Sequence, residues 1–252
     1  MAVPRLVGLE NGPRNLVLVR HGESLGNLAD ARAREQGADR LDLPARDADV
    51  ELSDEGRRQA DALGEWMAQA DHLPDVVLSS PYARALETAR RAVGHTDRDI
   101  VLDERLRERD LGRFDGLTGQ GIRKEFADEA ERRSHVGKFY YSPPAGESWA
   151  DVALRVRSLL ADLRHGFADQ RVWIFSHQAV IMTFRYVLEG LTEAELLEID
   201  RDTPIPNASM TTYEKGEGGL ELASFADTSV VDEREAEVTD EPSETEKADA
   251  DV

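Results

Sequence analysis

The chain has 252 residues, a formal net charge of −20 and no cysteine. The length allows one large domain with a sizeable core, and the lack of thiols excludes thiolate phosphatases, zinc–thiolate sites and disulfides. An acidic surface repels phosphate backbones and anionic lipids, so neither a nucleic acid nor a membrane is expected as a partner.

The start of the chain carries no evident targeting signal. Residues 1–14 lack the apolar core of a secretory signal, and no apolar run reaches the length of a membrane span. We therefore expect a cytoplasmic protein with one α/β domain over residues 1–225. The sequence leaves the oligomeric state open.

The first predicted strand carries the most chemical information. An apolar run over residues 16–19 ends abruptly in Arg20, His21 and Gly22, which is typical of a buried parallel strand with polar residues at its end. Open α/β sheets bind ligands at this end of their strands. An arginine beside a histidine can hold a phosphoryl group while a neutral ring nitrogen attacks it.

A helix and a second strand follow, and then another helix. Ser53 is a suitable N-cap for the first of these helices. Residues 75–80 predict the strand, after which Ser80 is expected to cap a helix with Pro81 at its first position. Arg84 then lies in the first helical turn, where the helix dipole favours an acid. The residue alone allows a surface ion pair or a phosphate ligand.

The next segment offers three candidates for a proton donor. A short strand is predicted over residues 99–102, and Glu104, Glu108 and Asp110 follow it. A departing alkoxide needs a carboxyl group that stays protonated, which an apolar wall can provide. The residues alone do not choose among the three.

Residues 115–145 predict a helical insertion over the edge of the sheet. Its acids and bases nearly balance, so a solvated helix face and a substrate lid both remain open. The stretch from 132 to 141 is more basic, and we expect contacts to a second anionic group there.

The second half of the chain repeats the opening pattern. Ser148 starts a long predicted helix, and an apolar strand over residues 171–176 ends in His177. If the two strands are adjacent, both histidines meet in one crevice. A Pro-rich loop and a hairpin over residues 203–225 close the domain. Residues 226–252 are acidic and poor in apolar side chains, which predicts a disordered tail.

Several of these motifs, in this order, resemble the histidine phosphatase superfamily. They are Arg-His-Gly-Glu from residue 20, Ser-Ser-Pro-x-x-Arg-x-x-x-Thr-Ala from residue 79, a glutamate four residues before Gly112, and the strand-end His177. The resemblance covers about residues 14–215. It implies an α/β fold, a three-layer αβα sandwich with a mainly parallel central sheet, as in phosphoglycerate mutase-like proteins.

The resemblance also implies three catalytic and three phosphate-binding residues. The catalytic residues are His21, Glu108 and His177, and the phosphate-binding residues are Arg20, Arg84 and Asn27. In this assignment His21 accepts the phosphoryl group and Glu108 serves as general acid and then base. The expected ligand is a small phosphorylated substrate. No metal and no cofactor are implied.

Within the superfamily, a phosphatase is favoured over a cofactor-dependent phosphoglycerate mutase. Such mutases carry Glu-Arg-His-Tyr-Gly at the general acid, whereas this chain reads Glu-Arg-Asp-Leu-Gly from Glu108. Residues 140–156 and 176–180 are similar to fructose-2,6-bisphosphatase domains. Two alternatives belong to other classes, a non-catalytic phospho-ligand binding module and a serine hydrolase with a Gly22-x-Ser24-x-Gly26 elbow.

Overall fold

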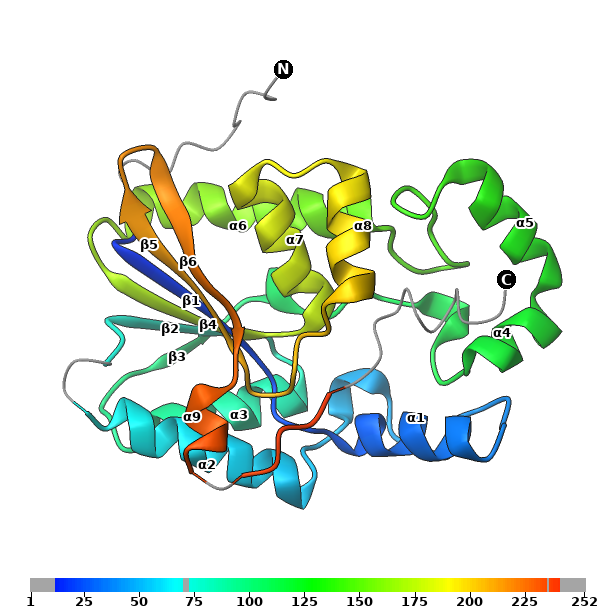
Figure 1. The fold of residues 1–252 in the computed structure, drawn as a ribbon, viewed down its shortest axis with the longest axis horizontal. Coiled ribbons are helices and arrows are strands. Elements are labelled where there is room, and N and C mark those ends of the chain that lie inside the picture. The colour runs from blue at the N-terminus through cyan, green and yellow to red at the C-terminus, as the bar shows by residue number, and fades with distance from the viewer. Residues whose placement is uncertain (1–11, 70–72, 235, 241–252) are drawn as a thin grey trace.

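The computed structural model describes residues 12–69, 73–234 and 236–240. Its centre is a six-stranded sheet in the order β3-β2-β4-β1-β5-β6 (Figure 1). β1, β2, β3 and β4 are parallel, and β5 and β6 form an antiparallel hairpin at one side. The strands are Asn15–Arg20, Val76–Ser79, Ile100–Leu102, Arg171–Ser176, Met210–Gly216 and Gly219–Asp227, β1 to β6 in order.

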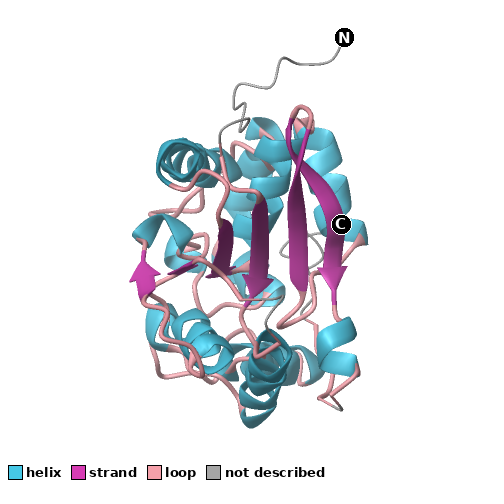
Figure 2. Ribbon diagram, turned by 90° about the vertical axis from the view of Figure 1, so that its left-hand side faces the viewer, coloured by secondary structure: helices cyan, strands magenta, loops and turns pink. Residues whose placement is uncertain are grey.

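Helices cover both faces of this sheet, as Figures 1 and 2 show. α6, α7 and α8 lie on one face, and α2, α3 and α9 lie on the other. The helices are Leu25–Glu35, Asp54–Met67, Ala83–Val93, Gly119–Glu125, Ala127–Val136, Trp149–Gly166, Gln178–Glu189, Glu193–Asp202 and Ser229–Asp232, α1 to α9 in order. The predicted αβα sandwich with a mainly parallel sheet is confirmed.

The alternation of side chains along β1 explains the two layers of core. Leu16 and Leu18 pack with α6 and α7, whereas Val17 and Val19 pack with α2 and α3. Successive residues of a strand point to opposite faces. A continuous apolar run is therefore required of a strand that is buried on both sides.

The sheet register brings the two strand-end histidines together. β1 and β4 are parallel neighbours, with Leu18 opposite Ile174 and Arg20 opposite Ser176. The backbone N–H of His21 also donates to the Ser176 carbonyl at 3.0 Å. His21 and His177 consequently leave the same edge of the sheet side by side.

The helix after β2 begins later than the sequence predicts. α3 begins at Ala83 with Tyr82 at the N-cap, and no side chain caps it. Ser80 lies two residues before the N-cap; its hydroxyl accepts from the Tyr82 N–H at 3.2 Å and lies 2.9 Å from Nε2 of His177. Arg84 is therefore the second residue of the helix.

The described part of the acidic tail differs from the sequence prediction. β6 continues to Asp227 and α9 follows, with Val230 and Val231 buried against α2. In Figure 1 the red segment after α9 runs along α2 toward the start of α1. Two adjacent valines add enough buried apolar area to order a short polar segment. Residues 241–252 lie outside the described residues, and disorder stays a prediction for them.

The segment predicted as a helical insertion contains α4 and α5. Both helices lie at the far right of Figure 1, beside α1. No helix among the described residues combines the length and the apolar character needed to cross a bilayer.

Candidate active site

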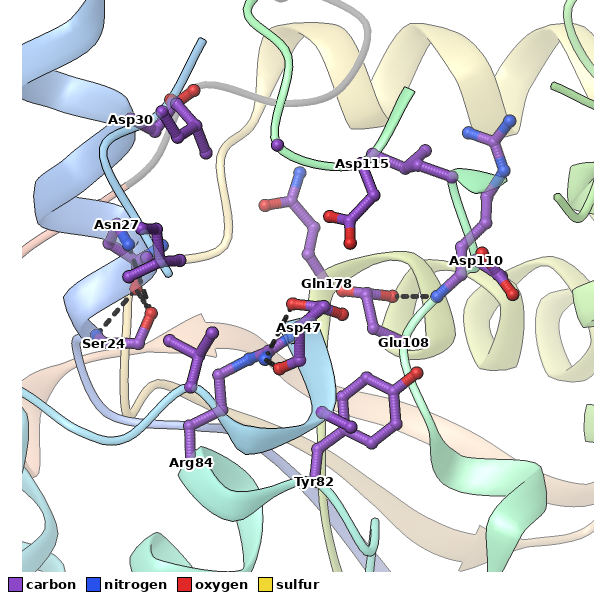
Figure 3. A pocket seen from close by; sticks show the side chains of 18 of the residues that line it. Ser24, Asn27, Asp30, Asp47, Tyr82, Arg84, Glu108, Asp110, Asp115 and Gln178 are labelled. Carbon is purple, nitrogen blue, oxygen red and sulfur yellow. Dashed lines mark hydrogen bonds and ion pairs between the residues drawn. The ribbon is translucent and has the colours of Figure 1, made fainter. Parts of the chain in front are cut away.

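A cavity of about 590 Å³ opens at the carboxyl edge of the sheet. Loops and helices that follow several strands line it, and Figure 3 labels ten of the lining side chains. Five of the six predicted site residues line this cavity: Arg20, His21, Asn27, Arg84 and Glu108. The sixth, His177, contacts one of them directly.

The two histidine rings lie with their centroids 5.2 Å apart. Nδ1 of His21 is 2.8 Å from the backbone carbonyl oxygen of Gly22. A carbonyl oxygen only accepts, so Nδ1 holds the proton and Nε2 carries the lone pair in the neutral ring. The neutral ring of His21 therefore has Nε2 as its lone-pair nitrogen.

His177 is fully buried beneath this ring. Burial holds its pKa well below the ordinary value, and the positive charge of Arg84 and the neighbouring His21 add to the effect. The ring edge of Tyr82 also packs against it at 5.3 Å between centroids. His177 is consequently a neutral ring near neutral pH.

Two buried arginines flank the histidines. Arg20 is 1% exposed, and its guanidinium donates to the carbonyl of Ile205. Arg84 donates from Nη1 to the Asp47 carbonyl at 2.6 Å and forms an ion pair with the Asp47 carboxylate at 2.9 Å. The sequence allowed Arg84 to be either a phosphate ligand or a member of an ion pair. In the structure it both lines the cavity and has an ion-pair partner.

Glu108 lines the same cavity. Its Oε1 accepts from the backbone N–H of Arg109 at 2.8 Å. Of the other two candidate acids, Asp110 lines the cavity, whereas Glu104 does not. Of the three candidate acids, the structure therefore brings Glu108 and Asp110 to the cavity.

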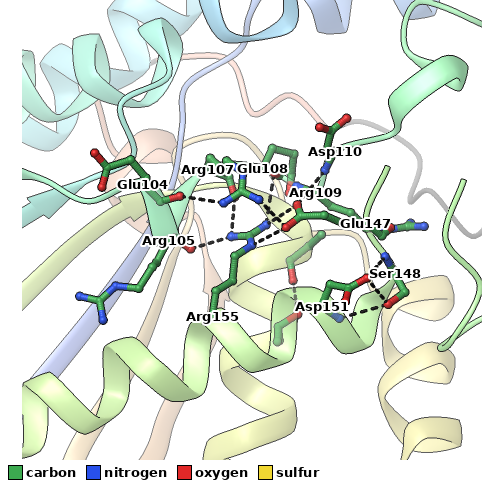
Figure 4. A network of polar contacts seen from close by, with 12 residues as sticks. Glu104, Arg105, Arg107, Glu108, Arg109, Asp110, Glu147, Ser148, Asp151 and Arg155 are labelled. Atoms are coloured by element: carbon green, nitrogen blue, oxygen red, sulfur yellow. Dashed lines mark hydrogen bonds and ion pairs between the residues drawn. The ribbon is translucent and has the colours of Figure 1, made fainter. Parts of the chain in front are cut away.

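A partly buried arginine of α6, Arg155, fixes the loop that carries Glu108, as Figure 4 shows. Arg155 donates to the carbonyls of Arg105 at 2.6 Å, Arg107 at 2.8 Å and Glu108 at 3.2 Å. Its Nε also pairs with Glu147 at 3.2 Å. Sequence reasoning missed Arg155, and the available signal was an arginine among the apolar positions of a core helix.

Asn27 and Ser24 form the start of α1. The Ser24 hydroxyl accepts from the Asn27 backbone N–H at 3.2 Å, and the Asn27 carboxamide oxygen accepts from the Ser24 N–H at 2.8 Å. This reciprocal pair is a capping box. Ser24 is thus a helix cap, and Nε2 of His177 contacts Ser80 instead of it. The geometry of a serine nucleophile elbow is not assembled here.

Three carboxylates occupy the remaining wall: Asp47, Asp110 and Asp115. Desolvation raises the pKa of Asp115, and the nearby Asp47 carboxylate raises it further. Rim arginines have acidic partners of their own, Arg40 with Glu125 at 2.8 Å and Arg46 with Asp49 at 2.6 Å. The wall is therefore acidic beyond the arginine and histidine cluster.

The basic stretch from 132 to 141 does not take the place expected for it. None of its residues lines this cavity. Arg132 lies 3.6 Å from Glu129, and the Tyr141 hydroxyl donates to the same carboxylate at 2.8 Å. Several residues of α4 and α5 instead line a second cavity of about 140 Å³.

Polar side chains from three other elements hold the backbone of loop 21–23. The Gly22 N–H donates to the Thr88 hydroxyl at 3.0 Å, and the Glu23 N–H donates to Gln59 Oε1 at 2.8 Å. Nδ2 of Asn207 donates to the His21 carbonyl at 3.2 Å. Sequence reasoning gave none of the three a role, because each reaches the loop from a distant part of the chain.

Close backbone packing makes glycine necessary inside this loop. A Cβ atom on Gly22 would lie 2.5 Å from the carbonyl oxygen of Gly56 in the first turn of α2.

The described residues contain no group of three or more His, Asp or Glu side chains arranged to hold a metal ion.

The chain is similar to named proteins over most of its length. It is 31% identical over 214 residues to a 2,3-bisphosphoglycerate-dependent phosphoglycerate mutase of Mesorhizobium japonicum, covering 80% of this chain and 97% of the mutase. A mycobacterial glucosyl-3-phosphoglycerate phosphatase superimposes with a TM-score of 0.67 and 29% identity, covering 84% of this chain and 98% of the phosphatase. Its complex with inorganic phosphate gives a TM-score of 0.65 at 28% identity, covering 85% and 97% of the two chains.

A family model matches as well, and its extent includes the whole site. The histidine phosphatase superfamily (branch 1) matches residues 16–228. This range runs from β1 to the end of the β5–β6 hairpin and contains both arginines, both histidines and Glu108. The chain therefore belongs to the histidine phosphatase superfamily, branch 1.

Proposed function

We propose that this protein hydrolyses a small phosphomonoester through a phosphohistidine intermediate, without a metal ion. The observation that carries the proposal is the placement of His21, with Nε2 as its lone-pair nitrogen, between two buried arginines and a neutral His177. Cationic and N–H donors around a phosphoryl group stabilise the charge on its three peripheral oxygens.

The first step transfers the phosphoryl group to His21. The bond from phosphorus to Nε2 forms as the bond from phosphorus to the ester oxygen breaks. Glu108, which lines the same cavity, gives its proton to the departing oxygen. Arg20, Arg84 and His177 bind the peripheral oxygens, and the arriving negative charge raises the pKa of His177 toward a protonated, donating ring.

The second step returns the enzyme to its starting state. Glu108, now a carboxylate, takes a proton from a water molecule as the water oxygen attacks phosphorus. The bond from phosphorus to Nε2 breaks, and inorganic phosphate leaves. Glu108 is protonated again at the end of the cycle, so its proton is conserved.

The acidic wall supports phosphate hydrolysis over the isomerisation that a mutase catalyses. Bisphosphoglycerate carries a carboxylate and a second phosphate, and both would face Asp110 and Asp115, since Asp47 is already paired with Arg84. Like charges at such range in a confined pocket cost binding free energy. A leaving group that bears hydroxyl or amino groups meets hydrogen-bond acceptors there instead. The mutase names of the curated relatives keep phosphoglycerate isomerisation as the second candidate.

Two assays together separate a phosphatase, a mutase and a binding module. Phosphate release is measured from a panel of phosphomonoesters in EDTA, and isomerisation of 3-phosphoglycerate is measured separately with 2,3-bisphosphoglycerate. Release that stops in His21→Ala, but continues in a control variant of the exposed His135, supports the phosphatase. Isomerisation without release would establish a mutase, and silence in both assays would favour a binding module.

A further inference from the structure

Loop 21–23, which carries the proposed nucleophile, is held by two buried carboxamides. Nδ2 of Asn207 donates to the His21 carbonyl, and Oε1 of Gln59 accepts from the Glu23 N–H. Both carboxamide side chains are 0% exposed. A carboxamide that forms a hydrogen bond through only its oxygen or only its nitrogen can rotate. The orientation of the Asn207 and Gln59 side chains therefore depends on what the other polar atom of each contacts.

The C-terminal segment supplies the contact at the other end of both carboxamides. The Thr239 hydroxyl donates to Oδ1 of Asn207 at 3.1 Å and accepts from Nε2 of Gln59 at 2.9 Å. The Thr239 carbonyl also accepts from the backbone N–H of Asn207 at 2.8 Å. One hydroxyl therefore joins two side chains that lie on either side of the loop.

Neighbouring contacts hold this segment in register along α2. The Glu237 N–H donates to the Glu55 carboxylate at 2.7 Å, and the Glu237 carbonyl accepts from Nε2 of Gln59 at 2.7 Å. Upstream, Val230 and Val231 are buried against the same helix. Contacts within residues 236–240 and contacts of the upstream valines thus both hold this segment against α2.

A hydroxyl at residue 239 meets a demand that few side chains can meet. The group must accept from one carboxamide and donate to the other at the same time, which a threonine or serine oxygen does and a methyl group does not. Loss of the hydroxyl would remove the donor to Oδ1 of Asn207 and leave one of the two N–H groups of Gln59 unpaired, while the other still donates to the Glu237 carbonyl.

We propose that Thr239 is a positioning residue of the active site, which fixes loop 21–23 through Asn207 and Gln59. The C-terminal segment is then a working part of the phosphatase and not an appendage. The effect on turnover rests on the proposed function of His21, whereas the effect on the loop does not.

The test compares Thr239→Val, which keeps the shape and removes the hydroxyl, with Thr239→Ser, which restores it. Thr228→Val is the matched control, because Thr228 donates to Asp232 at 3.0 Å at the start of α9 and does not contact the loop. A chain ending after Asp240 keeps Thr239 and removes residues 241–252. Each protein is assayed for kcat and KM and for amide hydrogen exchange over residues 20–24.

Thr239→Val is expected to lower kcat roughly tenfold with little change in KM, since small displacements of a nucleophile act on the chemical step. Exchange over residues 20–24 should rise, while exchange in β2 should not. Thr239→Ser, Thr228→Val and the chain ending at Asp240 should remain near the unchanged protein in both measurements.

Two results would overturn the proposal. One is unchanged exchange over residues 20–24 in Thr239→Val, and the other is an equal loss in Thr239→Ser. If the unchanged protein releases no phosphate from any ester, the proposed function fails. The exchange measurement still decides the placement of Thr239 in that case.

Discussion

The carboxylate of Asp47 lies 2.9 Å from Nη1 of Arg84, inside the cavity where a phosphoryl group is proposed to bind. The same arginine nitrogen also donates to the Asp47 backbone carbonyl. Asp47 begins a short 3-10 turn, Asp47–Asp49, that reaches the cavity from between α1 and α2. The arginine is thus pre-oriented by a carboxylate that a phosphate must outcompete.

Asp47→Asn is expected to tighten the binding of inorganic phosphate roughly fivefold. The variant removes a competing negative charge, and the backbone carbonyl still orients Arg84. The size follows from about 1 kcal/mol for a partly exposed ion pair. The inhibition constant of phosphate measures the effect, with Asp99→Asn as the control, since Asp99 is exposed and does not line the cavity. Weaker phosphate inhibition in Asp47→Asn would contradict the competition.

Arg155→Lys is expected to slow the departure of poor leaving groups. A lysine cannot bridge the three carbonyls that Arg155 holds, so the loop carrying Glu108 loses its position. We expect kcat to fall roughly tenfold to a hundredfold for an alkyl phosphate. p-Nitrophenyl phosphate needs little protonation and should lose much less. An equal loss with both esters would show that Glu108 is not what Arg155 positions.

The buried neutral state of His177 is expected to make the protein less stable in acid. Its pKa is lowered by folding, so below about pH 6.5 the unfolded chain takes up a proton at this residue that the folded chain does not. The contribution of His177 to stability is complete above that pH and declines as the pH falls toward the lowered value. The slope is at most about 1.4 kcal/mol per pH unit.

Urea unfolding at pH 7.5 and 5.5 measures this effect. His177→Gln should flatten the fall in unfolding free energy between the two pH values. A control variant of the exposed His135 should leave the fall unchanged. An identical pH dependence in His177→Gln and the unchanged protein would show that His177 titrates alike in both states.

Val231→Ala is expected to lower the unfolding free energy by about 2 kcal/mol, because it removes two buried methyl groups. Val238→Ala makes the same chemical change in the same tail at a side chain that is 37% exposed, and it should cost little. Equal stabilities of the two variants in a urea titration would show that α9 does not pack on α2 in solution.

Local sequence patterns determined those features that depend on near neighbours. The apolar runs of β1 and β4 identified two buried strands, and the polar residues at their ends identified His21 and His177. A continuous apolar run is typical of a strand buried on both faces, whereas the αβα sandwich with its mainly parallel sheet was implied by the family resemblance. Helix caps such as Ser53 and Ser148 were equally local.

Only the tertiary structure decided which side chains support the site. Arg155 reaches carbonyls 47 to 50 residues away, and Thr239 contacts Asn207 and Gln59, 32 and 180 residues away. No local pattern encodes such contacts, because sheet register and helix packing create them. The same holds for Val230 and Val231, whose segment looks too polar to fold until α2 offers them an apolar surface. The two candidate histidines were thus readable from strand ends, while the residues that contact and support their loops required the fold.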